Sequence, residues 1–131
     1  MNQKPMVIAL AVGLLSQIAG AHPQSQAPTS IVGRFSGPFE GGDGTVEITG
    51  SAPRYHVHIL VGADGCGGGV EGPASLDSKG RLVMVAKPAP AEEACQVTLT
   101  RSGSGWDVAN EGNCGFYHGA SCEFSGKVKP D

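Results

Sequence analysis

A chain of 131 residues is long enough for one domain of ordinary size. Its nine basic and twelve acidic residues give a formal charge of −3, and no basic patch with interleaved aromatic residues is present, which argues against nucleic acid as a partner. One Trp, two Tyr and four Phe are few aromatic side chains for a domain, so we expect a thin hydrophobic core.

The first 21 residues have the three parts of a secretory signal peptide. Lys4 supplies a positive charge, an apolar stretch follows over residues 6–15, and Ala19-Gly20-Ala21 fits a small-residue cleavage site. The apolar stretch is shorter than the roughly 20 residues that a membrane anchor needs. We therefore expect a periplasmic or secreted protein without a membrane span, whose mature chain, residues 22–131, carries eight basic and twelve acidic residues.

All four cysteines, Cys66, Cys95, Cys114 and Cys122, lie in this predicted mature chain. An even number of cysteines in a small exported protein predicts two disulfides. Three pairings are possible. We expect Cys114 to pair with Cys122 and Cys66 with Cys95, because the other pairings separate the two cysteines that are closest in sequence.

Residues 22–30 contain two prolines and no apolar periodicity, and they are predicted to form a flexible lead-in. From residue 31 to 131 we expect a single β-barrel domain, because short apolar stretches alternate with glycine-rich turns and helical spacing is absent. The glycines at 67–69 are interpreted as part of a turn, and Pro73 suggests an edge strand or a bulge. Eight strands are expected at 31–35, 45–49, 54–61, 70–76, 82–86, 95–101, 106–110 and 122–128.

These strands predict the fold class. Because most turns are short, neighbours in sequence should be neighbours in space, which indicates an antiparallel eight-stranded meander barrel or flattened barrel with two disulfides. Closing the barrel removes exposed strand edges. The disulfides would help to stabilise a core too small to hold the fold alone.

Catalytic motifs are missing from the sequence. It has neither a G-x-S-x-G elbow nor an H-E-x-x-H helix nor a phosphate-binding loop. With all cysteines in disulfides, no thiol nucleophile is expected. We therefore predict a protein that is not an enzyme, has no catalytic residues and needs no cofactor.

Two histidines could begin a metal site. His56 and His58 are two residues apart on an expected strand, so their side chains point to the same face, as zinc or copper ligands often do. The other histidines, His22 and His118, are far away in sequence. A periplasmic β-barrel that binds a small ligand or a metal (copper or zinc) is the alternative function; our expectation is that His56 and His58 face solvent without a metal.

The most distinctive stretch, residues 114–122, contains Phe116, Tyr117 and His118 between two cysteines. A disulfide-closed loop is preordered, so less entropy is lost when a partner binds. Tyrosine is a frequent anchor in interfaces, and a histidine can donate a hydrogen bond to a carboxylate. We therefore predict Phe116, Tyr117 and His118 as partner-binding residues, with Tyr117 and His118 at the tip of the loop.

Several short motifs that contain glycine, cysteine or aromatic residues lie along the chain. They are Gly33-Arg34-Phe35, Gly44-Thr45-Val46-Glu47-Ile48, Gly112-Asn113-Cys114, Tyr117, Gly119, Cys122, Phe124 and Gly126. Together they resemble the motifs of small exported bacterial β-barrel proteins described as lysozyme-inhibitor-like. The resemblance implies a non-catalytic protein that blocks a wall-degrading hydrolase, whereas the position of the inhibitory loop differs among such families and is not implied. A cationic lysozyme-like partner would be attracted by the net negative charge of the mature chain.

Overall fold

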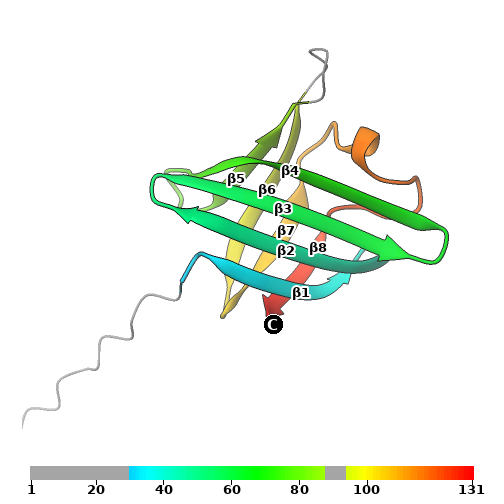
Figure 1. Ribbon diagram of the computed structural model, residues 1–131, viewed down its shortest axis with the longest axis horizontal. Coiled ribbons are helices and arrows are strands. Elements are labelled where there is room, and N and C mark those ends of the chain that lie inside the picture. Colours follow the sequence, from blue (N-terminus) through cyan, green and yellow to red (C-terminus); the bar gives the residue numbers. More distant parts are fainter. Residues whose placement is uncertain (1–29, 88–93) are drawn as a thin grey trace, which may run out of the picture.

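The computed structural model describes residues 30–87 and 94–131. The strands are β1 (Gly33–Phe39), β2 (Gly42–Ser51), β3 (Arg54–Ala63), β4 (Cys66–Leu76), β5 (Leu82–Ala86), β6 (Cys95–Ser102), β7 (Gly105–Asn110) and β8 (Gly126–Pro130), and a 3-10 turn, η1 (Gly115–Tyr117), lies between β7 and β8. Each strand pairs antiparallel with the next, and β8 pairs with β1 to close the barrel (Figure 1). The predicted all-β meander barrel with two disulfides is therefore confirmed.

Side chains from the strands fill the barrel interior. In β3, Val57, Ile59 and Val61 are buried, while the residues between them point outward, as the alternation of a strand requires. Trp106 lies in the same core and packs edge-to-face against Phe35, with ring centroids 6.3 Å apart. The largest side chains that are almost fully buried are Trp106, Phe124, Ile48, Ile59, Leu82, Met84 and Leu99.

β4 differs most from the expected pattern. It pairs with β3 from Cys66 to Ala74, so the glycines at 67–69 belong to a strand and the interpretation as a turn was wrong. With β5 it pairs only over residues 74–76. Pro73 lies where this second pairing ends, since proline has no N–H with which to continue the ladder. Between Cys66 and Pro73, one edge of β4 is therefore not paired with β5.

The last strand is displaced from its expected position. β8 begins at Gly126, and residues 122–125 form a connection that is bonded to the turn between β1 and β2. The Glu40 N–H donates to the Ser125 carbonyl at 2.8 Å, and the Glu123 N–H donates to the Glu40 carbonyl at 3.0 Å. These main-chain bonds replace the strand pairing that the apolar alternation of 122–128 had suggested.

The meander gives the barrel two distinct ends. One end, which we call the terminal end, contains Ser30, Asp131 and the β2–β3, β4–β5 and β6–β7 turns. This end faces the lower left of Figure 1. At the opposite loop end lie the β1–β2 and β3–β4 turns, the end of β5 and the β7–β8 connection with η1. Each segment that connects two strands therefore lies at one of these two ends.

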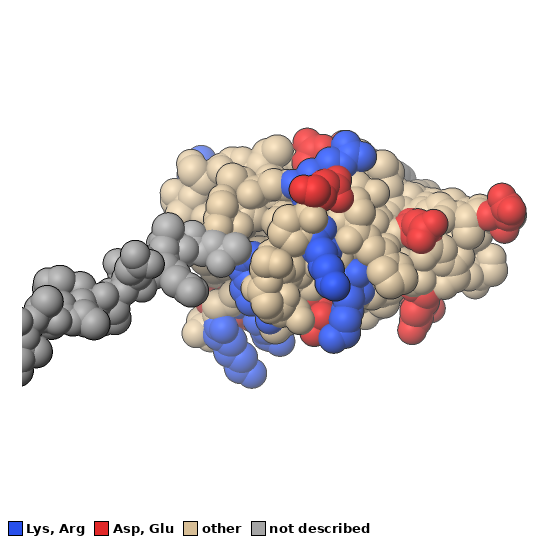
Figure 2. All heavy atoms as spheres, turned by 90° about the horizontal axis from the view of Figure 1, so that it is seen from below, with Lys and Arg blue, Asp and Glu red and all other residues tan. Residues whose placement is uncertain are grey.

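Charged side chains separate between these two ends. In Figure 2, acidic side chains occupy the right-hand tip of the molecule, and most basic side chains lie in its left and middle parts. Among the described residues, the loop end has one basic residue, Lys87, and five acidic ones, whereas the terminal end has six basic and two acidic residues. The acidic residues of the loop end are Glu40, Asp43, Asp64, Glu111 and Glu123.

Candidate functional site

The candidate site is built around residues 114–122, which we call the rim loop. This loop lies at the loop end of the barrel and contains η1, in which the Tyr117 N–H donates to the Cys114 carbonyl at 2.9 Å. Its two terminal residues, Cys114 and Cys122, are buried, while Phe116 between them is 71% exposed. The loop therefore has fixed ends and an exposed apolar centre.

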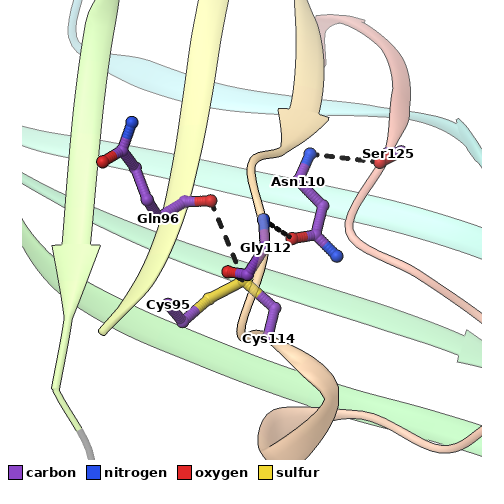
Figure 3. Close-up of a disulfide and its surroundings, with 6 residues drawn as sticks. All are labelled: Cys95, Gln96, Asn110, Gly112, Cys114 and Ser125. Carbon is purple, nitrogen blue, oxygen red and sulfur yellow. Dashed lines mark hydrogen bonds between the residues drawn. A yellow bond between two sulfur atoms is a disulfide. The ribbon is translucent and has the colours of Figure 1, made fainter. Parts of the chain in front are cut away.

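Each end of the rim loop is bonded to a different strand. Cys114 forms a disulfide with Cys95 at the start of β6, shown in Figure 3, and Cys122 forms one with Cys66 at the start of β4. The predicted pairing of Cys114 with Cys122 and of Cys66 with Cys95 was therefore wrong. The loop spans from β6 to β4 at the barrel end, so its cysteines meet different partners, with Cα–Cα distances of 4.6 and 6.1 Å.

The stem of the rim loop is also held by hydrogen bonds (Figure 3). The Gly112 N–H donates to the Asn110 side-chain oxygen at 3.0 Å, and the Asn110 N–H donates to the Ser125 hydroxyl at 3.2 Å. The Glu111 N–H donates to the Gln96 carbonyl at 2.8 Å. These bonds tie the end of β7 to β6 on one side and to the segment before β8 on the other.

The middle of the rim loop lies against the edge of β4 that β5 leaves uncovered. His118 and Gly68 form an antiparallel bridge, and the Gly119 N–H donates to the Gly67 carbonyl at 3.0 Å. A β-carbon at Gly68 would lie 2.6 Å from the Tyr117 carbonyl oxygen, a distance that real structures avoid. Gly68 is thus a position that supports the rim loop and that sequence reasoning missed, and the clustering of glycines at 67–69 was the signal that could have identified it.

The three predicted partner-binding residues occupy different environments. Phe116 forms the exposed tip and packs edge-to-face against Tyr117, with centroids 5.7 Å apart. Tyr117 is half-buried and packs against the barrel core. His118 points inward: its Nδ1 donates to the Gly119 carbonyl at 2.6 Å, and its ring lies edge-on to the buried Phe124 at 5.0 Å. Placing His118 at the tip was therefore wrong.

A depression of about 400 Å³ lies beside Tyr117, where β4 and β5 separate. An aromatic side chain at its border and charged groups within it are features common in binding sites. The depression extends the candidate site from the rim loop onto the outer wall of the barrel. Its lining residues are His58, Gly69, Val70, Glu71, Ala86, Lys87 and Tyr117.

His56 and His58 lie on the outer face of β3. The strand register places His58 between Glu47 on β2 and Glu71 on β4, and His56 Nε2 is 3.2 Å from Glu71 Oε2. Within the described residues, no three His, Cys, Asp or Glu side chains converge on a point that could hold a metal. The geometry here is that of a surface histidine–carboxylate pair.

The acidic side chains of the loop end influence one another. A side-chain hydrogen bond that protonated Glu40 donates to Glu123, together with the negative charge of Glu123, raises the pKa of Glu40 above the usual value for a glutamate. The electrostatic energy of these acidic groups falls when a positive charge approaches them. They lie at the same end of the barrel as the rim loop.

Comparisons with known proteins do not assign the chain to a family, because no family model, curated protein or solved structure matches it. Within residues 30–87 and 94–131, none of the helical segments has the length and apolar character needed to cross a membrane. The two disulfides fit an oxidising, extracytoplasmic environment.

Proposed function

We propose that the protein is a non-catalytic binding protein of the periplasm or the secreted medium, and that it uses the rim loop to inhibit a cationic lysozyme-like hydrolase. The observation that carries this proposal is the exposure of Phe116 on a loop fixed by a disulfide at each end. An exposed aromatic ring gains free energy when a partner buries it. A loop that is already ordered loses little entropy on binding.

The surroundings of Phe116 support a protein partner. Tyr117 and the adjacent depression provide an aromatic anchor and a concave surface, two features that concentrate binding energy in interfaces. A flat protein surface that exposes no aromatic side chain would lack such an anchor. We infer that Phe116 and Tyr117 form the centre of the interface and that the depression accepts side chains of the partner.

The charge of the loop end favours a cationic partner. Among the described residues, five acidic ones lie at the same barrel end as the rim loop, against one basic residue, Lys87. Complementary charges of this kind raise the association rate and the selectivity more than they raise the final affinity. Inhibition should therefore weaken as salt is added, mainly through slower association.

The choice of a hydrolase rests on the sequence motifs that resemble lysozyme-inhibitor-like proteins. A lysozyme binds its glycan in a cleft that contains two carboxyl groups. We infer that the aromatic tip of the rim loop enters such a cleft, with the exposed ring of Phe116 in the space of a sugar. His118 contributes by holding the loop on Phe124 rather than by contacting the catalytic carboxyl groups.

The test is an inhibition assay with protein collected from the exported fraction of its host. We expect micromolar protein to inhibit at least one of several cationic lysozymes acting on cell walls. Phe116→Ala and Tyr117→Ala should each weaken binding by about 2 kcal/mol or more, roughly 30-fold, if these rings are the anchors.

A matched control is Leu76→Ala, because Leu76 is also an exposed apolar residue but lies at the terminal end. This variant should inhibit as strongly as the unchanged protein. If all of the lysozymes tested remain fully active, the inhibitor proposal is refuted. If inhibition is seen but neither aromatic substitution weakens it, the assignment of the rim loop is refuted.

A further inference from the structure

The terminal end of the barrel combines positive charge with exposed apolar side chains. Two carboxylates there pair with arginines, Asp77 with Arg81 at 2.7 Å and Asp131 with Arg34 at 3.1 Å. Six basic against two acidic residues leave an excess of four positive charges, distributed around the whole end. The basic residues are Arg34, Arg54, Lys79, Arg81, Arg101 and Lys129.

Exposed apolar residues lie among these charges. Val32, just before β1, is 41% exposed, and Leu76, the last residue of β4, is 43% exposed. They are two of the four large hydrophobic residues that the described part of the chain exposes. Exposed apolar side chains together with an excess of basic ones are the combination that a protein surface presents to a bilayer.

The start of the described chain is held at this same end. Arg101 stacks on the Trp106 ring, with its guanidinium carbon 4.2 Å from the ring centroid, and its Nη2 donates to the Ser30 carbonyl at 2.8 Å. Val32 is two residues from Ser30, which this hydrogen bond holds to the barrel. The side chain of Val32 is therefore exposed in the folded protein itself.

We propose that the terminal end binds to the surface of a bilayer that contains anionic phospholipids. Lysine and arginine side chains are attracted to anionic headgroups, and apolar side chains between them enter the boundary between headgroups and acyl chains. A soluble polyanion would pair with the basic side chains, but it would not bury the exposed side chains of Val32 and Leu76. The lipid surface is the partner that accounts for both features.

Binding in this way also orients the molecule. The acidic loop end is repelled by the surface that attracts the terminal end, so the charges at both ends favour one orientation. In this orientation the rim loop points away from the membrane. It remains accessible to a partner in solution.

The test is co-sedimentation of the protein with vesicles at low salt, comparing phosphatidylglycerol mixed with phosphatidylcholine against phosphatidylcholine alone. We expect binding to the anionic vesicles only. Arg54→Gln and Lys79→Gln should each lower the partition coefficient about five-fold. Lys87→Gln, which removes the same charge from an exposed position at the loop end, should leave it unchanged.

A second pair of variants tests the apolar contribution. Leu76→Ser should lower partition, whereas Leu60→Ser, at a similarly exposed position on the outer wall of β3, should not. The proposal is overturned if anionic and neutral vesicles bind equally, or if Lys87→Gln weakens binding as much as Arg54→Gln. Equal effects of the two leucine substitutions would also overturn it, as would binding to soluble polyphosphate but not to vesicles.

Discussion

A β-carbon on Gly68 would lie 2.5 Å from the β-carbon of His118, so the rim loop rests on β4 at a position that only glycine can occupy without displacement. The contact joins the segment that carries the candidate site to the barrel wall. It also explains why β4 has a glycine at position 68, since any side chain there would push the rim loop away.

Replacing Gly68 should therefore displace the rim loop. We expect Gly68→Ala to lower the free energy of unfolding by about 1–3 kcal/mol, the usual cost of inserting an atom into a packed contact. Rim-loop amides should also exchange faster with solvent. The matched control is Gly67→Ala, whose added β-carbon would come no closer than 3.9 Å to the Val61 carbonyl oxygen. If the two variants unfold at the same temperature, the contact between Gly68 and His118 contributes nothing to the stability of the fold.

The disulfide pairing can be read directly from peptides. Digestion without reduction should release one pair of peptides linked through Cys66 and Cys122 and another linked through Cys95 and Cys114. Intact mass of the exported protein should match residues 22–131 less about four hydrogens, one pair for each disulfide. A peptide linking Cys114 to Cys122 would contradict the structure, and four free thiols would contradict both the structure and the sequence prediction.

Each disulfide should contribute to stability by restricting the unfolded chain. The loops closed by the disulfides span 56 and 19 residues, for which the chain-entropy relation predicts about 4 and about 3 kcal/mol, respectively. We expect Cys66→Ser with Cys122→Ser to lower the denaturation midpoint more than Cys95→Ser with Cys114→Ser does. Urea titration of the two double variants measures the difference, and the reverse order would contradict the entropic explanation.

The carboxyl pair at the loop end predicts a pH dependence. Because Glu123 raises the pKa of Glu40, protonated Glu40 stabilises the fold at low pH, and this contribution is lost as the pH rises from the ordinary value of 4.5 through the raised one. Glu40→Gln removes the repulsion. Calorimetry should therefore show the variant gaining stability over the unchanged protein as the pH rises towards neutrality. Equal pH trends in the variant and in the unchanged protein would contradict the coupling of Glu40 to Glu123.

Asp77 predicts the opposite trend at the terminal end. Its pKa is lowered, chiefly because the Arg81 N–H donates to its carboxylate at 2.9 Å. A lowered pKa stabilises the fold above the ordinary value of 3.8, and this contribution is lost as the pH falls through the lowered one. Asp77→Asn should melt below the unchanged protein near neutral pH. The difference should shrink in acid, and a constant difference would show that the charge has no role.

The histidines of β3 give a prediction about metals. His56 pairs with Glu71 at 3.2 Å, and we expect no tightly bound metal at His56 or His58. Elemental analysis of protein purified without chelators should show no stoichiometric zinc or copper. A metal content that is lost in His56→Ala but kept in His118→Ala would instead support the alternative function of a metal-binding barrel.

The strands themselves could be predicted from the amino-acid sequence, but the residues at which some of them begin and end could not. Alternation of apolar and polar residues in β2, β3 and β6 reports which side chains are buried, and it depends only on the local chain. The start of β8 at Gly126 depends instead on the bonds of Glu40 to Ser125 and Glu123, residues more than eighty positions away. Local patterns contain no signal for such distant main-chain bonds.

The all-β meander with two disulfides could be predicted from the amino-acid sequence, because residue spacing, cysteine count and turn residues are properties of neighbouring positions. The tertiary structure decided which cysteines meet, since disulfide pairing depends on distances in space rather than in sequence. It also turned His118 inward, left Phe116 exposed and gathered scattered charges into two opposite ends. These features form only when the barrel closes and brings distant segments together.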